Sequence, residues 1–573
     1  MTPFAQFIEA LRKIAPEQRR VLDQAAEQHA GDAFGVMKLV VERAIVSQAR
    51  ACQLWADCLG VAHVNPFNVE LPVGDGAQLP PDVARRARAV VLNSLPTAAT
   101  VAMVEPTDEK MVASLAKVLG REISPVFAHP EEIEAILRLH FGEADDLASS
   151  LERVCESLPT LEGGREIRDA RDVAELVHGE AFAELFNSIL LTAFRRRASD
   201  IHLESAVDQC RVRMRIDGDM MPVLQLPRVV HDALIVRVKV LCQLDVAQRR
   251  LPQDGAFEIN FGGNRPAFRA STLPGLYGEK AVLRLLGSGS EQTLPRLGAL
   301  GLSDSTRLAL RRTILRPNGI LFVCGPTGSG KTTTLYSCLS EINRPDLNIV
   351  TIEDPVEYRL PGAAQHQVNA QIGLRFSEIL RSVLRQDPDV ILVGEIRDRE
   401  TATIAAEAAL TGHLVLSSLH TNDSLQAITR LIELGVEPHL VAPTVVGVLS
   451  QRLVRRICPS CKESYTAAPD DLSPFFTKPD AAPVTLYRGR GCSHCHGTGF
   501  YGRVGVHEML EVSEGLRDLI LMRATPAQMK VEAENVGFRA MRYDGLKKAL
   551  LGWTTLEEVE RNTLPELSYT AAE

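Results

Sequence analysis

One run of eight residues has the spacing of a phosphate-binding loop. It matches G-x-x-x-x-G-K-[ST] at every fixed position, as Gly325-Pro326-Thr327-Gly328-Ser329-Gly330-Lys331-Thr332. Glycines let backbone N–H groups surround a phosphate, and a following helix adds a favourable dipole. We therefore expect this run, with Thr333, to bind a nucleoside triphosphate. Lys331 is expected to contact the β- and γ-phosphates, and the Thr332 hydroxyl to bind Mg²⁺.

The residues on either side of the loop have the composition that such a loop requires. Residues 319–324 form an apolar run typical of a buried parallel strand, and residues 333–339 suit the first turns of a helix. A glycine-rich turn that matched the pattern by chance would not be expected to have both a strand before it and a helix after it. The pattern therefore predicts a strand–loop–helix unit.

Three polar side chains follow further strand-like runs. Glu353, Glu395 and His420 come after the apolar runs 348–352, 389–394 and 413–419. Ligands bind at the carboxyl ends of strands in parallel sheets, and Glu395 occupies the position of the acid that holds Mg²⁺. Each residue alone is more often structural. Together with a phosphate loop, they indicate a hydrolytic site.

Four of the eleven cysteines form two C-x-x-C pairs separated by 30 residues, and the other seven are scattered singly. The pairs are Cys458–Cys461 and Cys492–Cys495, with Gly489, Gly491, Gly497 and Gly502 available for tight turns. Such pairs hold Zn²⁺ through four thiolates when the segment between them loops back. A redox pair or chance are the alternatives, and His494 or His496 could replace a thiolate. We expect a closed, structural zinc site.

Length and charge limit the class of protein. The chain has 573 residues and a formal net charge of −9, so no overall field attracts nucleic acid or anionic lipid. Residues 1–30 lack a signal-peptide core, and the apolar run 440–449 is too short to span a bilayer. We expect a cytoplasmic, soluble protein that reaches the membrane through partners.

The order of patterns suggests several domains. Helix 182–195 precedes strands at 200–204, 211–216 and 267–271, and Asp217-Gly218 forms a turn. The predicted divisions are residues 1–142, a linker at 143–171, an α+β domain at 172–290, an ATPase domain at 291–455, a cysteine subdomain at 456–510 and a helical subdomain at 511–573.

The chain resembles the secretion-type ATPases that power type II secretion and assemble type IV pili. The resemblance covers nearly the whole chain. It is most specific at GPTGSGKTTTLY, TIEDPVEY, LRQDPDVILVGEIRD, TGHLVLSSLHTND, the tetracysteine segment ending GRVGVHEML, ASDIHLE, VRMRIDG, RRLPQDG and STLPGLYGEKAVLRLL. It implies an α/β fold. In that fold a RecA-like ATPase domain follows a PAS-like α+β domain and an amino-terminal α/β docking domain, and it carries a tetracysteine zinc subdomain.

The resemblance also implies roles for individual residues. Glu353 falls on the catalytic carboxylate that polarises the attacking water, and Glu395 on the acid that serves Mg²⁺. The two histidines of the His box are His413 and His420. Arginines that reach phosphate from the preceding domain fall on Arg213, Arg215, Arg269 and Arg284. Strand-surface salt bridging is the alternative role for these arginines.

The family further implies a homohexamer with ATP between domains, docked on an inner-membrane protein and acting on a membrane platform protein. The amino-terminal likeness is best at 59–64 and 101–106. Some family members bind cyclic di-GMP there through a glycine-containing repeat. Residues 38–44 lack those glycines, so we expect partner docking and no dinucleotide binding.

Other functions remain as alternatives. Type IV pilus extension is close to the leading interpretation, which is a motor for pseudopilus assembly in type II secretion. Retraction motors are shorter and lack the cysteine pairs. A nucleic-acid translocase requires a basic, aromatic surface that this acidic chain lacks. The GTPase-like Thr477–Asp480 has no strand before it, and Lys331, Glu353 and Glu395 argue against an inactive scaffold.

Overall fold

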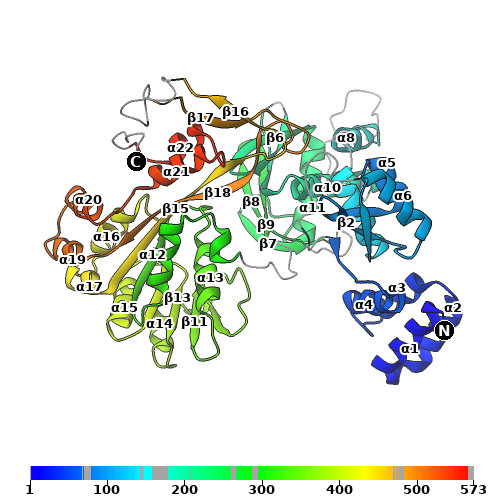
Figure 1. The fold of residues 1–573 in the computed structure, drawn as a ribbon, viewed down its shortest axis with the longest axis horizontal. Helices are drawn as coiled ribbons and strands as arrows, with labels where there is room; N and C mark the ends of the chain where they lie inside the picture. Colours follow the sequence, from blue (N-terminus) through cyan, green and yellow to red (C-terminus); the bar gives the residue numbers. More distant parts are fainter. Residues whose placement is uncertain are drawn as a thin grey trace. The chain divides into compact units, whose positions relative to one another are not determined.

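The chain divides into two units, Met1–Glu291 and Gln292–Glu573 (Figure 1). The computed structural model describes residues 2–66, 69, 79–141, 146–157, 179–207, 209–259, 266–286, 295–468, 472, 475 and 483–565. The GTPase-like Thr477–Asp480 and most of the predicted linker, including 158–171, lie outside these residues. No helix within them is both long enough and apolar enough to cross a bilayer.

The first unit begins with helices and a small sheet. Helices α1 to α4 bury Phe7, Leu11 and Val36 in a common core. A three-stranded sheet of order β1-β2-β3 follows, with β1–β2 antiparallel and β2–β3 parallel. The elements are α1 (Pro3–Ile14), α2 (Arg19–Gln28), α3 (Ala33–Glu42), α4 (Gln48–Leu59), α5 (Pro81–Ala87), β1 (Ala89–Ser94), β2 (Ala98–Met103), α6 (Glu109–Leu119), β3 (Glu122–Phe127) and α7 (Pro130–Phe141). This is the α/β character predicted for residues 1–142.

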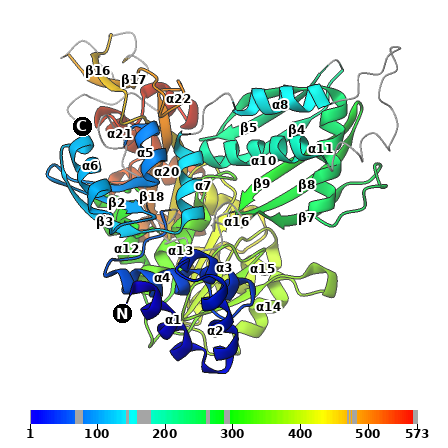
Figure 2. The ribbon, with the colours of Figure 1, turned by 90° about the vertical axis from the view of Figure 1, so that its right-hand side faces the viewer.

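A six-stranded antiparallel sheet of order β6-β5-β4-β9-β8-β7 forms the rest of the first unit. Helices α10 and α11 cover one face (Figure 2), and α8 packs in the same core through Leu147 and Val154. The predicted Asp217-Gly218 turn joins β5 to β6, with both residues at positive φ. The elements are α8 (Asp146–Ser157), α10 (Glu180–Arg195), β4 (Ala198–Glu204), β5 (Cys210–Ile216), β6 (Asp219–Leu226), α11 (Arg228–Leu241), β7 (Gln253–Glu258), β8 (Ala267–Gly275) and β9 (Gly278–Leu286).

The second unit is built on a seven-stranded sheet of order β12-β11-β13-β14-β10-β15-β18, in which only β18 is antiparallel to its neighbour. Every residue of β10 is buried, as expected for a parallel strand covered on both faces. Helices α12 and α13 cover one face, and α14 to α17, α19 and α20 cover the other. This layered α/β arrangement confirms the predicted fold class.

The elements of the second unit include the predicted strand–loop–helix unit, which is β10, the phosphate loop and α13. They are α12 (Asp304–Ile314), β10 (Gly319–Cys324), α13 (Lys331–Ile342), β11 (Ile349–Glu353), β12 (Ala363–Gln367), α14 (Phe376–Val383), β13 (Val390–Val393), α15 (Arg399–Leu410), β14 (Leu414–Leu419), α16 (Ser424–Glu433), α17 (Pro438–Thr444), β15 (Val445–Ile457), β16 (Lys462–Thr466), β17 (Thr485–Gly489), β18 (Phe500–Glu511), α19 (Glu514–Leu521), α20 (Pro526–Asn535), α21 (Met541–Leu550) and α22 (Leu556–Asn562). The strands at 319–324, 349–353, 390–393 and 414–419 confirm the predicted ones.

Candidate nucleotide-binding and metal sites

The loop between β10 and α13 has the backbone that its glycines allow. Gly325, Gly328 and Gly330 have φ values of 145°, 79° and 87°. At Gly325 an added Cβ would meet the Gln451 carbonyl oxygen at 2.4 Å. Glycine is therefore required there by space as well as by conformation. The loop leads directly into the N-terminus of α13, which favours an anion.

Lys331 bends back over this loop. Its Nζ donates to the carbonyl oxygens of Gly325 and Pro326 at 2.9 and 3.0 Å. Burial lowers the pKa of Lys331, and the nearby Glu395 acts in the opposite direction. The ammonium is thus held at the loop by weak neutral acceptors, which a phosphate oxygen can replace.

Gln451 of β15 supports the loop from below. Its Nε2 donates to the Ser329 carbonyl oxygen at 2.6 Å, and its Oε1 accepts from the Thr334 hydroxyl at 2.8 Å. One side chain therefore fixes the loop and the first turn of α13 together. Sequence reasoning missed Gln451, and the available signal was a glutamine that closely follows the apolar run 445–449.

Glu353 ends β11 and is only 4% exposed. Its Oε2 accepts from the Tyr336 hydroxyl at 2.6 Å, and its Oε1 accepts from the Thr351 hydroxyl at 2.7 Å. Gln365 Nε2 lies 3.3 Å from Oε1. Burial and the bond to Glu353 raise the pKa of Tyr336, so its proton stays on the phenol. Tyr336 and Gln365 were also missed by sequence reasoning.

Glu395 lies just beyond β13, the strand beside β11. Its Oε1 is 2.6 Å from an Arg397 nitrogen, and its Oε2 is 3.5 Å from His420 Nε2. The backbone N–H of Gly394 donates to the Ile352 carbonyl oxygen at 2.8 Å, which aligns the two strand ends. The structure therefore places Glu353, Glu395 and His420 at the edge of the sheet where the phosphate loop lies.

His413 lies at the other end of β14. Parallel pairing sets Leu414 beside Gly319 and Leu419 beside Cys324, so His413 is level with the start of β10. At about 3.3 Å per residue, roughly 23 Å of strand separates it from His420. His413 Nδ1 lies 2.8 Å from the Ala408 carbonyl oxygen. Within this chain the structure does not bring His413 to the phosphate loop.

The four predicted arginines lie in the first unit, on the face of the six-stranded sheet opposite its core. Arg213 donates twice to Glu204, at 2.9 and 2.8 Å, and Arg284 donates to Asp200 at 2.8 Å. Arg215 donates to the Gly218 carbonyl oxygen at 2.7 Å. Arg269 is exposed and pairs in register with Arg284.

Two further cations share this face. Arg211 and Lys280 contact Glu204 at 3.0 and 2.9 Å. Burial alone raises the pKa of Glu204, but hydrogen bonds from Arg213, Lys280 and Arg211 outweigh it and bring the pKa to about 2. The face therefore gathers six cations around Asp200 and Glu204, with Asp254 and Glu258 on its β7 side; the cations are Arg211, Arg213, Arg215, Arg269, Lys280 and Arg284. Such a surface can accept a polyanion.

The four predicted metal ligands meet in one cluster. All four Sγ atoms lie within 4.8 Å of one another, and three of the separations are 3.8, 3.8 and 3.7 Å. A tetrahedron with Zn–S bonds of about 2.3 Å has edges of about 3.8 Å. Backbone N–H groups of Gly491 and Gly499 donate to Cys461 Sγ and Cys495 Sγ, as suits thiolates. The residues present therefore fit a four-thiolate Zn²⁺ site.

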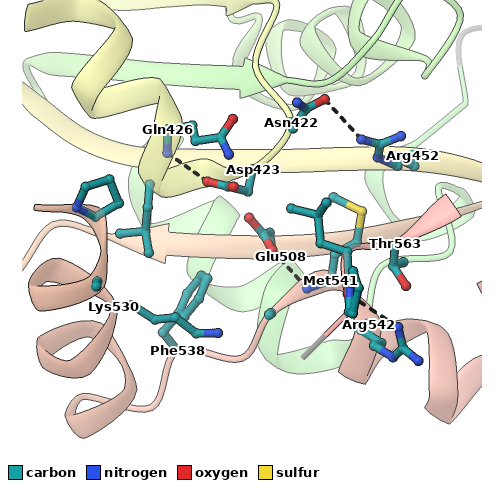
Figure 3. Close-up of a pocket in the computed structure, with 16 residues that line it drawn as sticks. Asn422, Asp423, Gln426, Arg452, Glu508, Lys530, Phe538, Met541, Arg542 and Thr563 are labelled. Atoms are coloured by element: carbon teal, nitrogen blue, oxygen red, sulfur yellow. Dashed lines mark hydrogen bonds between the residues drawn. The ribbon is translucent and has the colours of Figure 1, made fainter. Parts of the chain in front are cut away.

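A separate cavity of about 270 Å³ lies between α16, β15, β18 and the C-terminal helices (Figure 3). Arg452 donates to Asn422 in its wall at 3.2 Å. Glu508 is buried there and accepts from the backbone N–H groups of Ser424 and Met541 at 2.7 and 2.9 Å. Burial raises the pKa of Glu508 to about 7. No phosphate-loop residue lines this cavity, so it is not the phosphate site.

Comparison with known proteins gives the family. Residues 175–561 match the type II/IV secretion system protein family, and residues 59–147 match the MshEN domain. Type II secretion system protein E of Pseudomonas aeruginosa is 45% identical over 425 residues, 74% of this chain and 82% of that protein. The type IV pilus assembly ATPase PilB of Myxococcus xanthus is 38% identical over 551 residues, 95% of this chain and 96% of that protein.

A solved structure agrees on the fold. The ATPase DotB of Yersinia pseudotuberculosis is similar with a TM-score of 0.50 at 20% identity, over 68% of this chain and 95% of that chain. The phosphate loop and the strand-end carboxylates lie within the residues that match the family, which are most of the sequence. The chain belongs to the type II/IV secretion system protein family of ATPases.

Proposed function

We propose that this ATPase drives pseudopilus assembly in type II protein secretion. The meeting of Lys331, Glu353 and Glu395 at one edge of the sheet supports ATP hydrolysis, and the family supports its use in secretion or pilus assembly. The relative from Pseudomonas aeruginosa named for type II secretion has 45% identity. The second candidate is type IV pilus assembly, because the PilB relative covers 95% of the chain.

The residues of the site have distinct roles in this proposal. Gly325–Thr333 hold ATP, and the Lys331 ammonium leaves the loop carbonyls for the β- and γ-phosphates. The Thr332 hydroxyl and Glu395 hold Mg²⁺. Glu353 accepts the proton of the attacking water, which its place at the end of β11 supports.

His420 provides a sensor of the site. Its Nε2 lies beside Glu395, so a change in the charge next to Glu395 changes the hydrogen bonding of His420. Asn422 and Asp423 follow it and line the cavity that the C-terminal helices share. A change at His420 on hydrolysis is thereby transmitted to the C-terminal helices. His413, at the opposite end of β14, is left the role of a structural partner of Ala408.

The arginine face suggests how subunits cooperate. Arg213, Arg215, Arg269 and Arg284 are proposed to reach phosphate in a homohexamer, in which positive charge delivered late to the γ-phosphate stabilises the transition state. Residues 1–142 are proposed to dock on the cytoplasmic domain of an inner-membrane protein. A membrane platform protein is proposed to receive the motion of the ATPase. The cysteine cluster is proposed to hold one Zn²⁺ that stabilises residues 456–510.

An experiment in the native host distinguishes the two candidates. The chromosomal gene is replaced by the Lys331→Ala variant, with Arg344→Ala as a control because Arg344 lies just beyond the end of α13 that is far from the loop, and its side chain is 62% exposed. Secreted proteins in the medium and pili on the surface are then measured. Loss of secretion with normal piliation supports the proposal, and loss of pili alone supports the second candidate. Normal secretion and normal piliation overturn both.

A further inference from the structure

The carboxylate of Glu353 is held by groups from three different elements. Tyr336 comes from α13, the helix that begins at Lys331, and Gln365 comes from β12. Thr351 comes from β11 itself. The hydroxyls of Tyr336 and Thr351 bind different oxygens of the carboxylate, at 2.6 and 2.7 Å. Two short bonds at opposite oxygens fix both the position and the plane of the carboxylate.

The two oxygens are not used equally. Oε1 accepts from the Thr351 hydroxyl and, at 3.3 Å, from Gln365. Oε2 accepts from Tyr336 at 2.6 Å. Because a carboxylate oxygen has two acceptor positions, Oε2 keeps one for a further donor. Oε2 is therefore the oxygen suited to receive a proton from outside.

Tyr336 can also adjust to a change in the charge of Glu353. Its hydroxyl has a second acceptor, the Tyr358 carbonyl oxygen at 3.0 Å. Gln365 Nε2 lies 3.0 Å from the Tyr336 oxygen and 2.9 Å from the Tyr358 carbonyl oxygen. The other end of the Gln365 amide accepts from the Leu360 N–H at 2.8 Å, which settles its orientation. The network thus has a donor pattern for the ionised carboxylate and another for the protonated one.

We propose that Tyr336 and Gln365 are positioning residues that hold Glu353 ready to accept the proton of the attacking water. The inference rests on the proposed role of Glu353. In the step, a water O–H bond breaks and its proton goes to Oε2. The electron pair left on the water oxygen forms the bond to the γ-phosphorus as the bond to the ADP oxygen breaks. The Tyr336 proton turns from Oε2 to the Tyr358 carbonyl oxygen.

The placement of Tyr336 gives this network a second consequence. The same helix carries Lys331 and Thr332 at its first turn and Tyr336 one turn later. A movement of α13 on binding of phosphate therefore moves a donor of Glu353 as well. The helix that holds the phosphates therefore also sets the position of the Glu353 carboxylate. Tyr336 and Gln365 need not contact the nucleotide themselves.

The test compares Tyr336→Phe and Gln365→Met with Tyr487→Phe in the full-length protein. Tyr487 lies in β17 with its ring beside the Lys462 ammonium, outside the Glu353 network, so its variant controls for loss of a tyrosine hydroxyl. We expect kcat for Mg·ATP hydrolysis to fall about 10-fold or more in Tyr336→Phe, with KM within about twofold, as for loss of one charge-assisted hydrogen bond. Gln365→Met should show a smaller fall in kcat, and Tyr487→Phe should match the parent.

A double variant separates this inference from the role of Glu353. If the network acts through Glu353, Tyr336→Phe lowers kcat in the parent, and added to Glu353→Gln it leaves the binding of a fluorescent ATP analogue unchanged. A parental kcat in folded Tyr336→Phe and Gln365→Met overturns the inference while leaving Glu353 in its role. A change in KM alone overturns it also. Full turnover by Glu353→Gln instead overturns the proposed function of Glu353. Melting temperatures verify that each variant is folded.

Discussion

The phosphate-loop edge and the cysteine cluster are two sites in the same unit, but different forces hold them. Beneath the loop lie strands whose residues are buried on both faces, including all of β10 and β14. Cys458, Cys461 and Cys495 instead form a small cluster of their own, with Cys492 and Tyr501 beside them. Packing positions the first site before any ligand arrives. The second has only three buried cysteines in its cluster, so we expect it to depend on a bound metal to hold its turns.

This difference predicts how each site fails. At the sheet edge, one side chain can be removed and the fold persists, because the strands do not depend on it. At the cysteine cluster, one ligand supports the local fold, so its loss is a loss of structure. Changes to the first site should lower activity, and changes to the second should lower local stability.

The largest effect is expected from Lys331→Ala. Removal of the ammonium that reaches the β- and γ-phosphates should reduce ATP hydrolysis to below about a tenth of the parental rate. The melting temperature should stay close to that of the parent, since the Lys331 bonds to Gly325 and Pro326 are on the loop surface. Phosphate release and thermal unfolding measure the two quantities. A rate above that fraction contradicts the essential role of Lys331, and unfolding contradicts the comparison.

Glu353→Gln should stop turnover while ATP still binds. An amide cannot accept the proton of water, although it occupies the same space. Binding of a fluorescent ATP analogue and phosphate release are measured side by side. The control is Glu357→Gln, an exposed acid in the same segment, which should remain within about twofold of the parent. Lost binding with normal catalysis per bound nucleotide would move the catalytic role to Glu395.

Cys461→Ser should lower the zinc content and unfold the cysteine subdomain, with the phosphate loop still able to bind ATP. We expect about one Zn²⁺ per chain in the parent by elemental analysis. Limited proteolysis should then cut within the segment 456–510 first. Cys58→Ser, at a half-exposed cysteine outside the cluster, is the control. A parent without zinc, whose four thiols react freely in the folded state, shows the metal assignment to be wrong.

The smallest effects distinguish crowding from backbone strain at the cysteine cluster. An added Cβ at Gly489 would meet the Gly499 carbonyl oxygen at 1.9 Å, whereas one at Gly497 meets nothing within 4 Å. Gly497 has a φ of 79°, so Gly497→Ala should cost only about 1 kcal/mol of stability. Gly489→Ala should cost more, since two backbones cross there. Chemical unfolding of zinc-loaded protein compares them, and equal costs would show that this crossing tolerates a side chain.

Local patterns allowed much of the site to be predicted. The phosphate loop, its strand and its helix are contiguous, and Glu353 and Glu395 follow from the rule for strand ends. Gln451 could not be predicted, because it meets Thr334 across 117 residues. Gln365 and Tyr336 are polar partners of a buried acid: the pairing of β12 with β11 reveals the first, and the packing of α13 on the sheet reveals the second. Their types carry no signal of chemistry by themselves.

His413 shows the opposite case. The family motif includes both His413 and His420. Strand β14 lies between them, however, so they stand at its opposite ends. The sheet geometry was a better guide to its place within the chain than the motif. The antiparallel strands of the first unit were predicted from alternation, whereas the pairing of Arg213 with Glu204 depended on register.

Strand β15 links the two sites of the second unit. It pairs with β10 inside the buried sheet, supports the phosphate loop through Gln451, and ends at Ile457, next to Cys458. Arg455 on the same strand is tied to Glu558 at 2.6 Å, and pairing with β18 shifts register only between Arg455 and Ile457. From Gln451 to Cys458 the strand extends roughly 23 Å at about 3.3 Å per residue. One strand therefore joins the support of the phosphate loop, at Gln451 in the middle of β15, to the first metal ligand, Cys458, just past its end.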